Sequence, residues 1–139
     1  MTSGKLTGRA LAPGTASAEA IVLDQPLSLW GGLDPTSGEV IEPRHPQRGA
    51  SLAGRVVVMA QARGSSSSSS VLAEAVRAGA APAAILLAAP DLILAVGAAV
   101  ADELYRVQVP IVVLDRTDLA QLRTGDRVTI GEDGAVHVG

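Results

Sequence analysis

Cysteine and phenylalanine are both absent from this chain of 139 residues. Without cysteine there can be no disulfide, no thiolate nucleophile and no cysteine-ligated metal cluster within the chain. If the function needs an iron–sulfur centre, that centre must therefore come from outside this chain.

Aromatic residues are scarce as well, because the sequence has one Trp and one Tyr. The core must then be built from Val, Leu, Ile and Ala, whose small side chains imply closely packed layers. The net charge of −3 leaves no basic surface to neutralise phosphates, and there are too few aromatic rings to stack on bases. We therefore expect no nucleic-acid partner.

Long uninterrupted hydrophobic runs are also lacking. The most apolar window, Ala80 to Val100, is divided by Pro82, Pro90 and Asp91 into pieces the length of a strand and of a helix. The first residues form a polar run that does not resemble a signal peptide. These features predict a cytoplasmic protein that makes no contact with a membrane.

The middle of the sequence alternates strand patterns with helix patterns, an order typical of βαβ units. Strands are predicted at 55–60, 83–88 and 109–114, and helices at 71–79, at 92–105 and, more briefly, from 115 or 117 to 122. Two further strands at 6–11 and 19–24 are predicted to pair with each other, and 127–131 with 135–138 to form a closing hairpin. We predict one α/β domain over residues 1–139.

Six consecutive serines, Ser65 to Ser70, lie where the strand at 55–60 gives way to the helix at 71–79. Backbone N–H groups and hydroxyls at a helix N-terminus favour a bound carboxylate or phosphate. Aligned donors and the charge of Arg63 would also stabilise a serine alkoxide that acts as a base, or Arg63 would clamp a substrate carboxylate. The alternative is a solvated loop in which one serine merely caps the helix.

Five short motifs lie between residues 8 and 98: GRALAPG at 8–14, LWGGLDPTSG at 29–38, RH at 44–45, RGS at 63–65 and AVGA at 95–98. In this order they resemble the aconitase X small subunit, or swivel domain, also described as phosphomevalonate dehydratase small-subunit-like. The resemblance implies a three-layer β/β/α swivelling domain. Its central sheet would be mostly parallel, with helices on one face and further β structure on the other.

The resemblance also implies a hydro-lyase that eliminates water from a small hydroxy acid. The base in this superfamily is a serine that follows a glycine in the turn, which corresponds here to Ser65 after Gly64, with Ser66 beside it. A large aconitase X-type subunit would complete a heterodimer and carry an iron–sulfur cluster or iron, while this chain would bind no cofactor. A chain isolated from that partner should be inactive.

Eight residues around Ser65 form the predicted substrate site: Arg63, Gly64, Ser66, Gly31, Gly32, Asp34, Arg44 and His45. The resemblance places the loop at 31–34 near the mouth of the active site, although Asp-Pro is also an ordinary turn initiator. The pair at 44–45 would contact substrate or partner, or be a structural part of a proline-rich loop. Trp30 is either an interface anchor or an anchor of its own loop.

Two substrates fit the resemblance: cis-3-hydroxy-L-proline, favoured by a composition that is rich in Ala, Gly and Arg, and mevalonate 5-phosphate. Two other function classes remain open. One is a swivelling phosphohistidine carrier, because residues 122–130 resemble the closing strand of such domains, although serines occupy the turn where a carrier needs histidine. The other is a non-catalytic module that binds an anion at the serine turn.

Overall fold

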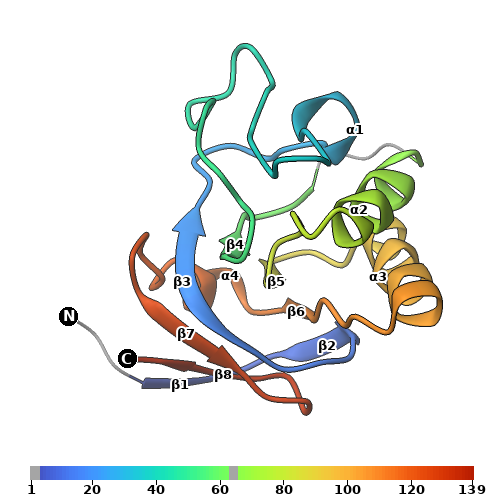
Figure 1. Cartoon of the computed structure of the whole chain (residues 1–139). Helices are drawn as coiled ribbons and strands as arrows, with labels where there is room; N and C mark the ends of the chain where they lie inside the picture. Colours follow the sequence, from blue (N-terminus) through green and yellow to red (C-terminus); the bar gives the residue numbers. More distant parts are fainter. Residues whose placement is uncertain (1–3, 63–65) are drawn as a thin grey trace.

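The computed structural model describes residues 4–62 and 66–139. The strands in this part of the chain are β1 (Gly4–Thr7), β2 (Arg9–Ala12), β3 (Ala16–Val22), β4 (Val56–Val58), β5 (Ala84–Leu87), β6 (Ile111–Val113), β7 (Arg127–Ile130) and β8 (Ala135–Val138). The helices are α1 (Leu29–Gly32), α2 (Ser68–Arg77), α3 (Leu92–Tyr105) and α4 (Arg116–Leu119). Figure 1 shows α2 and α3 side by side against one side of the sheet.

All the strands belong to one strongly curved sheet in the order β1-β8-β7-β3-β4-β5-β6-β2. The four central strands β3 to β6 are parallel, and the outer strands are added in antiparallel fashion. The two edge strands, β1 and β2, are neighbours in the sequence and are separated only by Gly8. The sheet is therefore bent almost into a closed barrel (Figure 1).

Gly8 is required at this closure because its backbone lies against the side chains of Val112 and Leu114, where an added Cβ would clash. Its N–H donates a hydrogen bond to the carbonyl of Gly134 at 3.1 Å, which ties the closing turn of the β7–β8 hairpin to the junction of β1 and β2. A long-range contact of this kind sets the path of the first strands.

Two hydrophobic cores lie on the two sides of the parallel strands, since successive side chains of a strand point to opposite faces. Val57 and Ile85 face α2 and α3, in a core that also holds Leu72 and Leu94. Val56, Val58 and Leu86 face the inside of the curved sheet and pack against β7, β8 and α4. Continuous apolar strands are expected where both faces are covered.

The predicted three-layer β/β/α fold is confirmed, with the helices α2 and α3 on one face and the β1, β7 and β8 strands on the other. The helix predicted at 92–105 has these bounds, and the side chain of Asp91 caps it by accepting a hydrogen bond from the Leu94 N–H at 2.9 Å. The closing hairpin is formed by β7 and β8. Helix α2 begins at Ser68, three residues earlier than predicted, inside the serine tract.

The prediction that strands 6–11 and 19–24 pair with each other is wrong. Gly8 divides the first into β1, which pairs with β8, and β2, which pairs with β6, while β3 pairs with β4 and β7. The connection at 13–15 looks like a hairpin turn, but it carries the chain from one edge of the sheet to its middle. In residues 4–62 and 66–139, no helix is long and apolar enough to cross a membrane.

Candidate functional site

The serine tract follows β4 at the carboxyl edge of the parallel strands. The predicted base Ser65, with Arg63 and Gly64, lies outside the described residues, so the structure begins again at Ser66, whose side chain is exposed. Carboxyl ends of adjacent parallel strands are the usual place for ligands in α/β sheets. The tract therefore lies at the edge where a ligand is expected.

The serines at the start of α2 have different roles. Ser68 is buried, with 4% of its surface exposed, and its Oγ accepts a hydrogen bond from the backbone N–H of Trp30 at 3.4 Å. The Ser69 hydroxyl donates to the Ser66 carbonyl at 3.0 Å, and the Val71 N–H donates to the Ser67 carbonyl at 3.2 Å. The second half of the tract is thus an ordered first helical turn.

Helix α3 holds this turn in place from behind. Gly97 lies so close to α2 that an added Cβ would be 2.8 Å from the carbonyl oxygen of Ser69 and 3.0 Å from its Cα. No side chain fits between the two helices at that point. The glycine of the motif at 95–98 therefore allows the close helix crossing that positions the serine turn.

Helix α1, which contains Gly31 and Gly32, lies beside the start of α2 (Figure 1). Gly31 has a φ of 77°, and an added Cβ on Gly32 would be 2.7 Å from Cδ1 of Leu27. The structure therefore brings both predicted glycines next to the serine turn. Gly32 is constrained by packing against Leu27, whereas Gly31 has open space around its Cβ position and is distinguished by its positive φ. Trp30, which directly precedes Gly31, keeps 61% of its surface exposed, and Ile41 keeps 41% exposed.

Asp34 closes a turn in the same loop but at a greater distance from the serines. Its carboxylate accepts hydrogen bonds from the Thr36 N–H at 2.9 Å and the Thr36 hydroxyl at 2.7 Å, and these bonds lower the pKa of Asp34. The turn ends at Gly38, where an added Cβ would be 2.7 Å from the Ala80 carbonyl, beyond the C-terminal end of α2. Substrate contact by Asp34 stays a prediction; the geometry gives it a turn-forming role.

His45 is buried, with 4% exposed, although it follows the exposed Arg44. Its Nε2 is 2.9 Å from the Gln25 carbonyl, and its Nδ1 accepts a hydrogen bond from the Gln47 N–H at 3.0 Å. Since Nδ1 is the acceptor, Nε2 must carry the proton that it donates to Gln25. Both ring nitrogens are therefore engaged in holding the loop, and a role in substrate binding stays a prediction, as it does for Arg44.

A hollow of about 190 Å³ lies at the same carboxyl edge, where β3 and β4 end. Its lining residues come from both strands and from α4: Val22, Leu23, Val58, Met59, Ala60, Arg116, Leu119 and Ala120. Sequence reasoning missed Arg116. The available signal was its place directly after the predicted strand at 109–114, because that strand ends at the same edge as the one before the serines.

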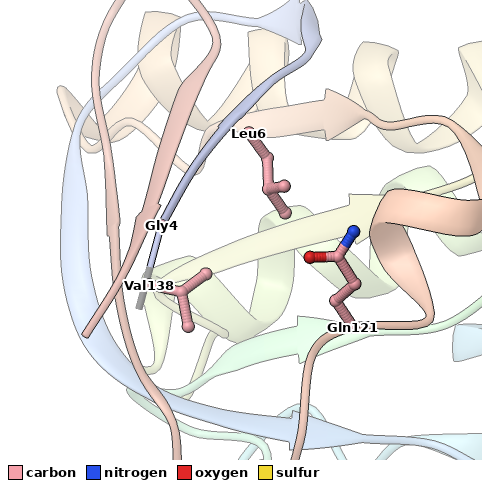
Figure 2. Close-up of a pocket in the computed structure, with 4 residues that line it drawn as sticks. All are labelled: Gly4, Leu6, Gln121 and Val138. Carbon is pink, nitrogen blue, oxygen red and sulfur yellow. The ribbon is translucent and has the colours of Figure 1, made fainter. Parts of the chain in front are cut away.

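Two further hollows differ from this one in size and in lining. One is lined by Leu6, Gln121 and Val138 (Figure 2). Its volume of about 20 Å³ leaves room for about one water molecule. A groove of about 270 Å³ between α2 and α3 is lined by Ser69, Ser70 and Tyr105, with Glu74, which pairs with Arg77. Among residues 4–62 and 66–139, no three His, Asp or Glu side chains gather as a metal site would require.

Comparison with known proteins gives a consistent result. The family model described as the aconitase X swivel domain matches residues 5–138. A crystal structure of Thermococcus kodakaraensis aconitase X in its holo-form matches with a TM-score of 0.87 and 34% identity, over 98% of this chain and 98% of that one. The phosphomevalonate dehydratase small subunit of Thermococcus onnurineus is 36% identical over 96% of this chain and 98% of its own length.

A different kind of relative is more similar in sequence. The cis-3-hydroxy-L-proline dehydratase of Pseudomonas aeruginosa is 50% identical over 76% of this chain, but the match covers only 18% of that protein. The corresponding enzyme of Hypocrea jecorina is 36% identical over 88% of this chain and 21% of its own. The chain thus spans about a fifth of these relatives.

Proposed function

We propose that this chain, which belongs to the aconitase X swivel-domain family, is the small subunit of a dehydratase and supplies the base that takes a proton from the substrate. The observation that supports this most strongly is the position of the serine tract. It lies at the carboxyl edge of the parallel sheet and at the start of a helix, in a fold that matches aconitase X over 98% of its length.

In the proposed reaction, a C–H bond and a C–O bond of the substrate break and a double bond forms between the two carbons. Ser65, as its alkoxide, accepts the proton through its Oγ, and the hydroxyl leaves as hydroxide, which takes up a proton from solvent to form water. Ser65 then returns its proton to solvent, so that the net change is the loss of one water molecule from the substrate. Backbone N–H groups at the start of α2 stabilise negative charge on a serine oxygen. The close packing of Gly97 against Ser69 supports this role, because a base must be held at a fixed position.

We propose cis-3-hydroxy-L-proline as the substrate. A relative that is 50% identical carries this activity in its name, which supports the choice over mevalonate 5-phosphate. The second candidate has support of another kind, because the named phosphomevalonate dehydratase small subunits match this chain over nearly their whole length. The two substrates differ in chemistry, since only the second carries a phosphate.

A direct assay separates the two substrates. The chain is co-expressed with the aconitase X-type large subunit of the same genome, and the purified complex is given each substrate in turn. We expect loss of water from cis-3-hydroxy-L-proline and at most a trace of turnover of mevalonate 5-phosphate. The reverse preference would assign the second function, and a complex that acts on neither would refute the proposed activity.

The large subunit is also the proposed site of the metal centre. The chain has no cysteine to ligate an iron–sulfur cluster, and residues 4–62 and 66–139 hold no group of three or more His, Asp or Glu side chains that could bind iron. We propose that the partner holds it. An active site divided in this way between two subunits requires a docking surface that brings the serine turn to the partner.

Trp30 is the expected anchor of that docking surface. It is exposed beside the serine turn, and its backbone is fixed to Ser68. Truncation of a central aromatic anchor usually costs at least 2 kcal/mol, so Trp30→Ala should raise the Kd for the large subunit about 30-fold or more. The measurement is calorimetric titration of the large subunit with the chain.

Leu104→Ala provides the matched control for Trp30→Ala. Leu104 is just as exposed, at 63%, but lies in the last turn of α3, about 10 Å along the helix from Gly97. We expect its Kd to stay within a factor of about three of the wild type. An equal rise in Kd for both variants, or no rise in Kd for Trp30→Ala, would place the docking surface elsewhere.

A further inference from the structure

The hollow at the ends of β3 and β4 combines aliphatic walls with a single charged residue. Its walls are aliphatic, from Val22, Leu23 and Met59 on the sheet to Leu119 on α4. At about 190 Å³ it is smaller than the 300–1,000 Å³ typical of drug-sized ligands. A molecule with a short carbon skeleton fits these dimensions.

Arg116 is the one charged residue among those that line the hollow. Its side chain is exposed, and within the described residues it makes no hydrogen bond or ion pair. Arg77, Arg123 and Arg127, in contrast, do donate side-chain hydrogen bonds. A guanidinium binds a carboxylate through two parallel hydrogen bonds, so an unpaired one at the edge of an apolar hollow is suited to an organic acid.

The topology relates this hollow to the serine turn. Strand β4 ends at Val58, which lines the hollow, and the chain then leads through Ala60 to the serine tract in the sequence. Arg116 follows the end of β6. Strands β4 and β6 are parallel neighbours of β5, so both end at the same edge. An acid bound by Arg116 would therefore lie on the edge of the sheet that carries the serines.

We infer that Arg116 is a substrate-binding residue and that it binds the carboxylate of the substrate while the carbon skeleton lies in the hollow. The inference rests on the proposed function for the identity of the ligand, because both candidate substrates carry a carboxylate. It does not rest on that function for the existence of the site, which is a property of this chain alone.

The first test uses the chain without its partner and a simple probe. Tens of millimolar L-proline is added to the ¹⁵N-labelled chain, and amide shifts are followed by NMR. We expect changes at Leu23, Ala60 and Ala120 that Arg116→Gln abolishes and that prolinamide, which lacks the carboxylate, does not produce. Shifts that persist in Arg116→Gln, or no shifts at these amides in the wild-type chain, would overturn the inference.

Arg55→Gln is the matched control, because Arg55 directly precedes β4 and so lies at the opposite edge of the same sheet. It should leave the proline-induced shifts unchanged. If Arg55→Gln loses the shifts to the same extent as Arg116→Gln, the shifts depend on the net charge of the chain. That result would also contradict a specific site.

The second test uses the complex with its large subunit and the substrate that it turns over. Hydrogen bonds to charged groups predict that Arg116→Gln raises KM about 10- to 100-fold with a smaller change in kcat, and that Arg116→Lys recovers part of the loss. An unchanged KM in an active complex refutes the role of Arg116 and leaves the proposed function standing. A complex inactive on both substrates, with proline still bound through Arg116, refutes the proposed function only.

Discussion

Replacing Ser65 by alanine in the complex with the large subunit is expected to lower kcat by about 10²- to 10⁴-fold, the usual contribution of a positioned general base. The substrate should still bind, because the alanine removes only the oxygen that accepts the proton. KM is therefore expected to change by less than about threefold. Steady-state kinetics of water loss, measured on complexes of equal subunit content, give both values.

Ser66→Ala is the control for this variant, because Ser66 is the next residue and its side chain is exposed. If the hydroxyl of Ser65 alone acts as the base, Ser66→Ala should keep kcat within about tenfold of the wild type. A Ser65→Ala complex that assembles and retains full kcat would contradict the assignment. A large loss in Ser66→Ala alone would move the base by one residue.

Replacing Gly97 by valine is expected to lower the free energy of unfolding more than any other substitution proposed for this chain. The Cβ of the new side chain would lie 2.8 Å from the carbonyl oxygen of Ser69. Backbone atoms cannot move aside as the end of a flexible side chain can. Overpacking of a tight contact usually costs about 1–3 kcal/mol of the free energy of unfolding. Because the clash is with the first turn of α2, kcat of the complex should fall as well.

Ala99→Val is the control for Gly97→Val, because Ala99 is an exposed residue of the same helix. Its loss of stability measures the effect of the lower helix propensity of valine without the clash. Urea denaturation of both variants measures the difference. We expect Ala99→Val to cost less than about 1 kcal/mol and to leave kcat unchanged. Equal stability of Gly97→Val and Ala99→Val would mean that the helix crossing is not tight.

The parallel part of the fold could be predicted from the sequence because it is encoded locally. Val56 to Val58 and Ile111 to Val113 are short apolar runs, and α3 has a cap at Asp91. The pairing of β1 with β8 and of β2 with β6 could not be predicted in this way. It depends on the packing of Gly8 against the side chain of Val112 and on the hydrogen bond from the Gly8 N–H to the Gly134 carbonyl. Both partners are far from Gly8 in the sequence.

The candidate site was predictable to a similar extent. The change from strand to helix at the serines is a local pattern, and the ordered turn at Ser68 agrees with it. His45 shows the limit, because nothing in a proline-rich segment indicates that both ring nitrogens bind the backbone of the same loop. Arg116 shows the same limit, since its hollow exists only when α4 packs under β3 and β4.

The central claim is that this chain supplies the base to an active site completed by a large subunit. The most direct test is to titrate a fixed amount of purified large subunit with the chain and to measure the initial rate of water loss from cis-3-hydroxy-L-proline. We predict no rate from either protein alone, a rise to a plateau at one chain per large subunit, and competitive inhibition by the Ser65→Ala chain. Full activity of the large subunit alone would contradict the account.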